Sequence, residues 1–284
     1  MRRRWTTALL VIAALVALAC EEGGAVADPE PSATGKPRSG LPSSMAALGD
    51  SITSGFGTCL ALVKCERNSW STGDSARVDS HYRRIKRDND AIDGRAHNFS
   101  VPGGRAAGLA DQAAQAVRAK VDYVTVLIGG NDACRATVDA MTPAAAFRRD
   151  IDEALGALKK GLPKARVLVV SVPDLHRLWE IGHQDERAVK AWDNGICPSL
   201  LANPTSTARA DEERRAAVAE RVEAYNRALS AACEAYGKRC VYDNGAVHKV
   251  RFTLDMVNRL DYFHPDTDGQ KKLAEVTFGR AFPG

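Results

Sequence analysis

Short apolar runs alternate along the chain with longer segments in which Ala, Leu and Val recur at helical spacing. The runs 123–128 (YVTVLI) and 166–172 (RVLVVSV) are continuous and rich in β-branched residues, which is typical of strands buried on both faces of a parallel sheet. Shorter runs predict further strands at 45–48, 97–101 and 240–242. Helical spacing predicts helices over 108–120, 144–160, 211–236 and 269–278.

Strands that alternate with helices predict an α/β fold of right-handed βαβ units, with a parallel sheet covered by helices on both faces. No internal repeat and no second linker interrupts the pattern after Met45, so we expect one domain over 45–284. Ligands of open parallel sheets bind at the carboxyl ends of the strands. The residues that follow each predicted strand are therefore the first candidates for a functional site.

The first twenty residues have the pattern of an export signal. Three arginines at 2–4 precede an uncharged apolar run of 14 residues, 6–19, which is shorter than a membrane-spanning helix needs. The run ends in Ala17-Leu18-Ala19-Cys20, which is similar to a bacterial lipobox and predicts lipidation of Cys20. Ala25-Val26-Ala27 is the alternative, a site for ordinary signal peptidase. We expect a signal peptide over 1–20 and an extracellular protein, either secreted or anchored as a lipoprotein to the outer face of a bacterial cell membrane.

Segment 21–44 is rich in Pro, Gly, Ser and Ala and has few large apolar side chains. Such a segment buries too little surface to offset its ordering entropy, so we expect a disordered linker. The chain as a whole has 284 residues, 45% hydrophobic and 26% charged, as in an ordinary soluble globular protein. Its formal net charge is only +4, and three of the positive charges lie at 2–4. This balance gives no electrostatic footprint for nucleic acid.

Seven cysteines are distributed over the chain: Cys20, Cys59, Cys65, Cys134, Cys197, Cys233 and Cys240. Without Cys20 an even six remain, which in an exported chain predicts three disulfides. Six cysteines allow 15 pairings. Proximity in the chain favours Cys59–Cys65 and Cys233–Cys240, which leaves Cys134–Cys197 as the long-range bridge. A zinc site is the alternative, but no C-x-x-C or paired Cys/His spacing occurs, so we expect no metal.

Two motifs carry the elements of nucleophilic catalysis. Gly49-Asp50-Ser51 directly follows the first predicted strand, where a serine hydroxyl can point out of the sheet. Asp261 and His264 are three residues apart near the C-terminus, a spacing that can set the carboxylate against one ring nitrogen. A serine needs a base to take its proton, and the base works best when a carboxylate fixes its tautomer. We expect Asp50 to hold the turn by accepting backbone hydrogen bonds.

Two further motifs can supply hydrogen-bond donors to an oxyanion. Gly129-Gly130-Asn131-Asp132 follows the strand at 123–128, and segment 98–104 (NFSVPGG) contains the end of the strand at 97–101 and the Pro102-Gly103-Gly104 turn after it. An Asn amide and a Gly backbone N–H can both stabilise the negative charge of a tetrahedral intermediate. Each motif alone is also common in ordinary turns, but four strand ends in this order form a coherent set for acyl transfer.

These four blocks resemble those of the SGNH (GDSL) hydrolase superfamily, in the same order and over nearly the whole of 45–284. The cysteine-containing insert after Ser51 is most similar to secreted actinobacterial esterases and to the phospholipase-B-like branch. The resemblance implies that Ser51 is the nucleophile, His264 the general base and Asp261 its orienting acid. It further implies an oxyanion hole of Ser51, Gly103 and Asn131, in which Gly104 is the alternative to Gly103. It implies a flavodoxin-like three-layer α/β/α sandwich and no metal or organic cofactor.

The leading hypothesis is an exported serine hydrolase that cleaves carboxylic esters through an acyl-enzyme. A lipase or phospholipase acting on long-chain lipids is the second, and a non-catalytic surface lipoprotein that keeps the fold is the third. The loops at 58–80 and 180–209 bear on specificity, and their pattern predicts no structure. We expect a monomer whose partner is a small-molecule or lipid ester, with no nucleic acid, and with membrane contact only through an anchor at Cys20.

Overall fold

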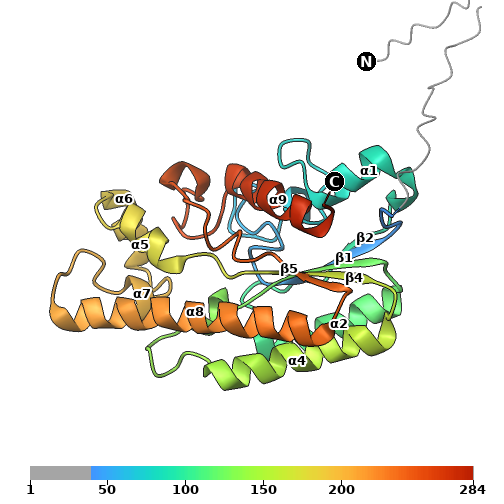
Figure 1. Ribbon diagram of the computed structural model, residues 1–284. Coiled ribbons are helices and arrows are strands. Elements are labelled where there is room, and N and C mark those ends of the chain that lie inside the picture. The colour runs from blue at the N-terminus through green and yellow to red at the C-terminus, as the bar shows by residue number, and fades with distance from the viewer. Residues whose placement is uncertain (1–39, 284) are drawn as a thin grey trace, which may run out of the picture. The chain divides into compact units, whose positions relative to one another are not determined.

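The computed structural model describes residues 40–283 and contains a five-stranded parallel sheet (Figure 1). The strand order is β2-β1-β3-β4-β5, and every neighbouring pair is parallel. The strands are β1 Met45–Gly49, β2 Ala96–Asn98, β3 Tyr123–Leu127, β4 Arg166–Val170 and β5 Cys240–Tyr242. All five lie where the apolar runs predict them, which confirms the α/β fold class. The predicted signal peptide, Cys20 and most of the predicted linker lie outside the described residues.

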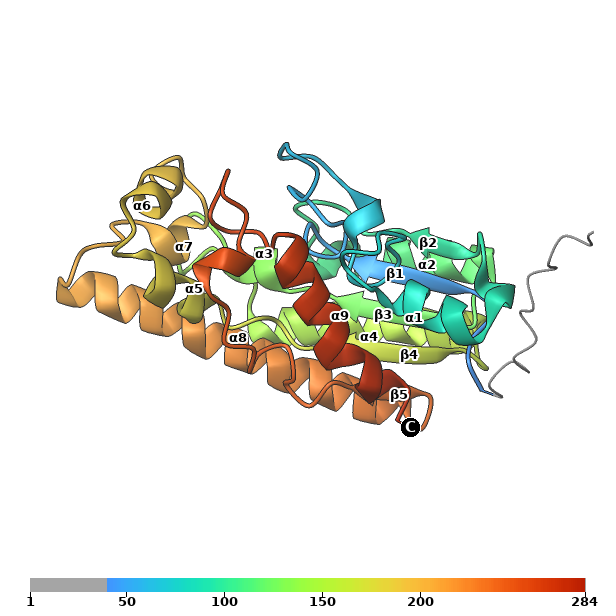
Figure 2. The ribbon, with the colours of Figure 1, turned by 90° about the horizontal axis from the view of Figure 1, so that it is seen from above.

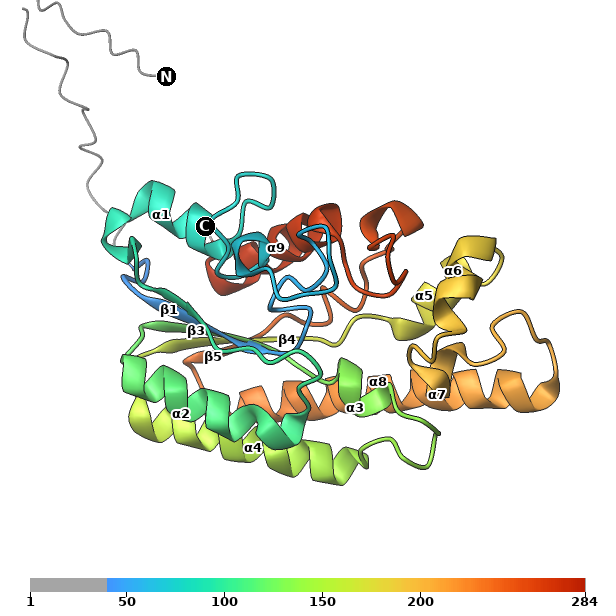
Figure 3. The ribbon, with the colours of Figure 1, turned by 180° about the vertical axis from the view of Figure 1, so that it is seen from behind.

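Helices cover both faces of this sheet, as Figures 1 and 3 show, with α2, α4 and α8 on one face and α1 and α9 on the other. The nine α-helices of the described residues are α1 His81–Asp88, α2 Leu109–Ala119, α3 Gly130–Ala133, α4 Ala144–Gly161, α5 Leu175–Gly182, α6 Glu186–Trp192, α7 Pro198–Leu201, α8 Arg209–Tyr236 and α9 Thr267–Ala281. None of the helices in 40–283 is long and apolar enough to cross a membrane.

Successive side chains of each strand point to opposite faces of the sheet, so the strands contribute to two cores, one under each helical layer. Ala46 and Leu48 of β1 are fully buried against the layer of α2, α4 and α8, whereas Met45 packs on the side of α1 and α9. Because successive side chains of a strand point to opposite faces, a run buried on both faces must be apolar throughout. The continuous apolar runs in the sequence are the result of this double burial.

The segment between β4 and α8 forms α5, α6 and α7, which extend beyond the carboxyl ends of the strands (Figure 1). A disulfide joins Cys197, the N-cap of α7, to Cys134, which directly follows α3. The other two disulfides are Cys59–Cys65 and Cys233–Cys240. The Cys134–Cys197 bridge thus connects the end of β3 with the inserted helices.

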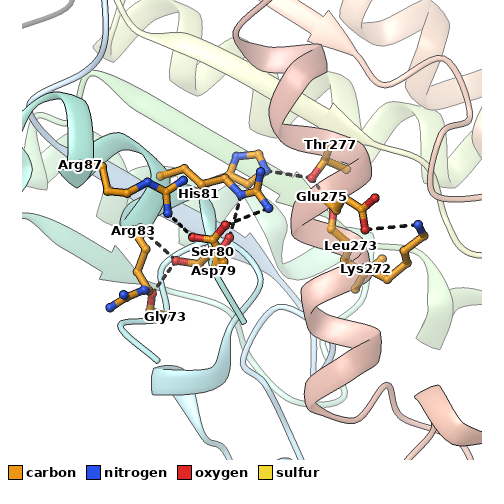
Figure 4. A network of polar contacts seen from close by, with 11 residues as sticks. Gly73, Asp79, Ser80, His81, Arg83, Arg87, Lys272, Leu273, Glu275 and Thr277 are labelled. Carbon is orange, nitrogen blue, oxygen red and sulfur yellow. Dashed lines mark hydrogen bonds and ion pairs between the residues drawn. The ribbon is translucent and has the colours of Figure 1, made fainter. Parts of the chain in front are cut away.

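The helix α1 has no counterpart among the predicted helices, and its first residue is buried. His81 contacts Tyr123 Oη with Nδ1 and Thr277 Oγ1 with Nε2, each at 2.8 Å. Figure 4 shows His81 of α1 directed toward Thr277 of α9. Burial, together with the nearby positive charge of Arg84, lowers the pKa of His81 to about 3. His81 is therefore a neutral, structural link between α1, α9 and the sheet.

The last residues of the predicted linker contact the domain. Ser43 donates hydrogen bonds from its N–H and its hydroxyl to Asp122 Oδ2, at 3.1 and 2.6 Å. The Asn89 amide donates to the carbonyls of Leu41 and Pro42. These bonds hold the chain at the amino end of β1, the opposite end of the strand from Ser51.

Candidate active site

Ser51 lies in the turn that directly follows β1, and a glycine makes that turn. A Cβ on Gly49 would lie 2.2 Å from the carbonyl oxygen of Leu127 in the neighbouring strand, so no other residue fits there. The side chain of Gln112, on α2, accepts from the Gly49 N–H at 2.7 Å and donates to its carbonyl at 3.0 Å. The strand end that carries Ser51 is therefore held from both sides.

Asp50 is buried beside the serine. Its Oδ1 accepts from the N–H of Ile52 at 2.9 Å, so the side chain closes the turn as the sequence predicts. Its Oδ2 is buried and has no hydrogen-bond partner. Burial raises the pKa of Asp50 to about 7, against the opposing effects of the Ile52 N–H and of His264.

A hydrogen-bonded chain joins Asp261, His264 and Ser51. His264 Nδ1 lies 2.7 Å from Asp261 Oδ2, and His264 Nε2 lies 2.8 Å from Ser51 Oγ. The other carboxylate oxygen of Asp261 accepts from the N–H groups of Phe263 and His264, at 2.9 and 3.1 Å. All three side chains thus have the mutual geometry of a nucleophile, a base and an orienting acid.

The segment that carries His264 is fixed by its own turn and by its neighbours. Tyr262 has a left-handed backbone with φ of 51°, and its carbonyl accepts from Trp192 Nε1 of α6 at 3.0 Å. The N–H of Asn258 donates to the His264 carbonyl at 2.8 Å. The ring of Phe56 lies 4.8 Å from the imidazole, between centroids. Rotation of the imidazole away from Ser51 is therefore opposed by packing as well as by Asp261.

Asn131 lies in α3, immediately after β3. Its Nδ2 donates to the Gly104 carbonyl at 3.1 Å, which connects two of the motifs. An amide NH₂ has two hydrogens, so one remains for another acceptor. Gly103 has φ of +76° and open space around its Cα. Asn131 shares a pocket with Ser51 and His264, whereas neither Gly103 nor Gly104 lines that pocket in the described structure.

Asp132, the residue after Asn131, forms hydrogen bonds to neighbouring segments of the chain. Its carboxylate accepts from the Ala106 N–H at 3.0 Å and from Thr142 Oγ1 at 2.8 Å. Its carbonyl accepts from Tyr225 Oη of α8 at 3.2 Å. Burial raises the pKa of the Asp132 carboxyl above its ordinary value. Buried hydrogen bonds therefore fix the segment after β3 that carries Asn131.

The pocket beside Ser51 is mostly apolar. Its polar lining consists of Asp50, Ser51, Asn131, Asp174 and His264. The remaining lining residues are Ile52, Gly130, Pro173, Leu175, Leu178, Phe252, Val257, Phe263 and Pro265. In residues 40–283 no group of three or more His, Cys, Asp or Glu side chains is arranged to hold a metal ion.

Three side-chain amides outside the four sequence motifs position the site. Besides Gln112, the Gln270 side chain of α9 donates to the Ile52 carbonyl at 2.7 Å and accepts from the Trp70 N–H at 2.9 Å. The Asn258 side chain donates to the Gly57 carbonyl at 2.6 Å. A signal for Gln112 was present, because a polar residue stands on the face of its helix that otherwise carries Leu109, Ala113 and Ala116.

Comparison with solved structures shows the same fold in ester hydrolases of low sequence identity. A putative GDSL-like lipase from Parabacteroides merdae is 15% identical with a TM-score of 0.53, over 84% of this chain and 94% of its own. A catalytic mutant of an acetylxylan esterase from Geobacillus stearothermophilus is 16% identical with a TM-score of 0.52, over the same shares of the two chains. A comparison with curated protein sequences gives no match.

Family comparison is more specific than these structural similarities. Residues 47–272 match the GDSL-like lipase/acylhydrolase family, and this range contains Ser51, Asn131, Asp261 and His264. The match covers well over half of the chain and confirms the resemblance found in the four blocks. The chain therefore belongs to the GDSL-like lipase/acylhydrolase family.

Proposed function

We propose that this protein hydrolyses carboxylic esters through an acyl-enzyme formed on Ser51. The observation that carries the proposal is the hydrogen-bonded chain from Asp261 through His264 to Ser51. An alcohol is a weak nucleophile until a base takes its proton, and an imidazole held by a carboxylate can take it at neutral pH. A non-catalytic role for the fold would not require this geometry.

In the proposed reaction, Ser51 Oγ attacks the ester carbonyl carbon while its proton moves to His264 Nε2. The C–O bond to the alcohol then breaks, and His264 returns the proton to the leaving oxygen. Water, activated by the same imidazole, attacks the acyl-enzyme and releases the acid. Asp261 stays ionised and stabilises the imidazolium that forms in each half of the reaction.

The oxyanion of each tetrahedral intermediate would accept hydrogen bonds from the Ser51 N–H, the Gly103 N–H and Asn131 Nδ2. The second hydrogen of the Asn131 amide, which the Gly104 carbonyl does not use, supports this role. The left-handed backbone at Gly103 allows a peptide N–H to be presented close to a ligand. The N–H of Gly104, the alternative donor, already donates to the Val101 carbonyl at 2.8 Å, which favours Gly103.

The apolar pocket supports a substrate with an apolar acyl group. Its lining includes the apolar side chains of Leu175, Leu178, Phe252, Val257 and Phe263. Apolar walls around a few convergent polar groups are the usual character of small-molecule sites. This lining favours the second candidate function, a lipase acting on longer acyl chains, over an esterase confined to acetyl groups.

Export and lipidation are part of the proposal. Three disulfides in the described residues support an extracellular or periplasmic location, because such bonds persist in oxidising compartments. We infer that Cys20 carries the lipid anchor and that the protein acts as a monomer. Incorporation of labelled palmitate into the wild-type chain, and its loss in Cys20→Ser, tests the anchor.

Covalent labelling tests the catalytic proposal. An organophosphonate should modify Ser51, and the modification should map to the peptide that contains it. Ser51→Ala should lose ester hydrolysis by a factor on the order of 10⁶ while keeping its fold. Ser230→Ala is the matched control, because Ser230 lies on α8 and does not line the pocket beside Ser51. Labelling at another residue, or full activity of a folded Ser51→Ala, would reject the proposal.

A further inference from the structure

The large apolar side chains that are exposed in the described residues all lie on three loops, close to the hydrogen-bonded residues Asp261, His264 and Ser51. Leu60 is 98% exposed, Leu62 44% and Val63 52%, all within the loop closed by the Cys59–Cys65 disulfide. Val101 is 50% exposed and Leu260 54%. Scattered exposed apolar residues are ordinary on protein surfaces, but their confinement to one region is informative.

Hydrogen bonds connect the disulfide loop to the segment of Asp261 and His264. The Gly57 N–H donates to the Val63 carbonyl at 3.0 Å, and the Gly57 carbonyl accepts from Asn258 Nδ2 at 2.6 Å. The other end of the Asn258 amide accepts from the Leu260 N–H at 2.7 Å. The loop tip and Leu260 are thus held beside each other, next to the base of the triad.

Val101 belongs to the loop that carries the proposed oxyanion glycines. Its N–H donates to the Gly49 carbonyl at 3.1 Å, two residues before Ser51, and its carbonyl accepts from the Gly104 N–H at 2.8 Å. Figure 2 shows the loop that follows β1 and the segment that precedes α9 rising at the same end of the domain, on either side of α3. Hydrogen bonds therefore hold each of the three loops close to Ser51 or to the segment of His264.

We propose that Leu60, Leu62, Val63, Val101 and Leu260 form an apolar rim that inserts into the surface of aggregated lipid, so that the enzyme takes its ester substrate from a lipid–water interface. This inference rests on the proposed ester hydrolysis and specifies how the substrate is presented. None of these five side chains lines the apolar pocket, but Phe263 and His264, which do, follow Leu260 by three and four residues. An acyl chain that leaves the lipid beside the rim would therefore meet the apolar lining next to Ser51.

The construction of the rim favours a lipid surface over a protein partner. Residues 60–63 (LALV) are consecutive and uncharged, and the short disulfide ring prevents the loop from folding back over its own apolar tip. Leu60 projects almost wholly into solvent, from a left-handed backbone with φ of 69°. Fluid lipid can close around projecting side chains, whereas a protein interface needs a complementary packed surface.

The charged residue that follows the apolar tip of the loop also fits a lipid surface. Lys64 follows the apolar tip directly and is partly exposed, in an ion pair with Glu66 at 2.6 Å. A lysine beside an inserted apolar segment can keep its ammonium group at the level of lipid phosphates while its stem contacts the acyl region. The order of apolar tip and flanking lysine is that of a shallow interfacial anchor.

The test compares one ester in dissolved and aggregated form. The full chain is used, with Cys20→Ser in every variant so that no acyl anchor at that position contributes to binding. Tributyrin hydrolysis is measured below and above the solubility limit. Wild-type activity should rise steeply once droplets form. The double variant Leu60→Ser/Val63→Ser should lose most of that rise and should keep its rate on dissolved ester within about twofold.

Binding gives an independent measurement. Flotation with phosphatidylcholine vesicles, in the Ser51→Ala background to prevent hydrolysis, should show about tenfold weaker partition for the double variant, because two apolar side chains no longer leave water. Leu60→Trp should strengthen partition, and Lys160→Ser, an exposed change on α4 outside the rim, should leave it unchanged. Thermal unfolding of each variant checks that its fold is intact.

The outcomes separate the two proposals. Failure to hydrolyse tributyrin in either form would reject ester hydrolysis itself. Hydrolysis of dissolved ester without a rise on droplets, or equal vesicle binding by wild type and double variant, would reject the apolar rim alone. A concentration-dependent dimer that Leu60→Ser/Val63→Ser abolishes would assign the rim to a second copy of the chain and would likewise overturn the lipid-surface proposal.

Discussion

His264 lies between two partners at hydrogen-bond distance, and the shorter of the two contacts, 2.7 Å, is with Asp261. Because Asp261 Oδ1 is engaged by two backbone N–H groups, the carboxylate cannot rotate without breaking three hydrogen bonds. The base is thereby oriented by a carboxylate that is itself held in place.

Asp261→Asn should lower kcat for ester hydrolysis by up to about 10⁴-fold, because an amide at this position favours the wrong imidazole tautomer and cannot stabilise the imidazolium. Steady-state kinetics measure the effect, and circular dichroism checks the fold. Asp255→Asn is the matched control, since Asp255 is exposed and pairs only with Arg259 in the same segment. Near-normal turnover of Asp261→Asn would reduce the triad to a dyad of Ser51 and His264.

Asn131→Ala should lower kcat by roughly 10²–10³-fold, the usual cost of one oxyanion donor, and should change KM much less. The donor acts mainly after negative charge has developed on the carbonyl oxygen, so substrate binding is little affected. A change confined to KM would place Asn131 in substrate binding. Asn194→Ala, at an exposed turn after α6, provides the control for a surface amide.

The Cys134–Cys197 disulfide should contribute more to stability than Cys59–Cys65. The sequence separations are 63 and 6 residues, and loop-closure entropy then predicts about 4 and 2 kcal/mol. Urea unfolding of Cys134→Ala/Cys197→Ala and of Cys59→Ala/Cys65→Ala measures both. We also expect the variant Cys134→Ala/Cys197→Ala to have a lower kcat on dissolved ester, because the lost disulfide holds the residue that directly follows α3. Equal losses of stability would contradict the entropic account.

His81 should make the protein sensitive to mild acid. The folded pKa of about 3 lies below the ordinary value of 6.5, so the unfolded chain binds more protons between these values. The contribution of His81 is therefore complete above pH 6.5 and falls as the pH drops toward 3, by about 1.4 kcal/mol per pH unit. Urea unfolding at several pH values measures this dependence.

His81→Gln isolates the effect, because glutamine is neutral throughout this range. The variant should be less stable at pH 7, and its stability should depend less on pH between 4 and 6. Comparison with the variant is necessary because Asp50 acts with the opposite sign: its raised pKa favours the folded state at low pH and is lost as a stabilising factor through about pH 7. Identical pH slopes in wild type and His81→Gln would contradict the prediction.

The positions of the strands could be predicted from the sequence, because burial on both faces of a parallel sheet leaves continuous apolar runs. The long helices could be predicted because their apolar residues recur at helical spacing. The helices α5, α6 and α7 could not. They are short, and their stability depends on tertiary contacts such as the Trp192 bond to Tyr262 and the bridge at Cys197. Helix α1 was missed for the same reason, since His81 is polar in sequence but buried against Tyr123 and Thr277.

The candidate site, like the fold, could be predicted only in part from the sequence. The sequence by itself determined the chemistry available at each strand end and the Asp261–His264 pair, because three residues of separation can close within one turn. Only the tertiary structure decided that His264 meets Ser51, 213 positions away, and that Gln112, Gln270 and Asn258 hold the strand ends around them. The physical reason is that such amides bond to backbone groups, which every residue carries, so their partners leave no mark in the sequence. Parallel strands bring distant segments to one edge, and packing selects which side chains touch there.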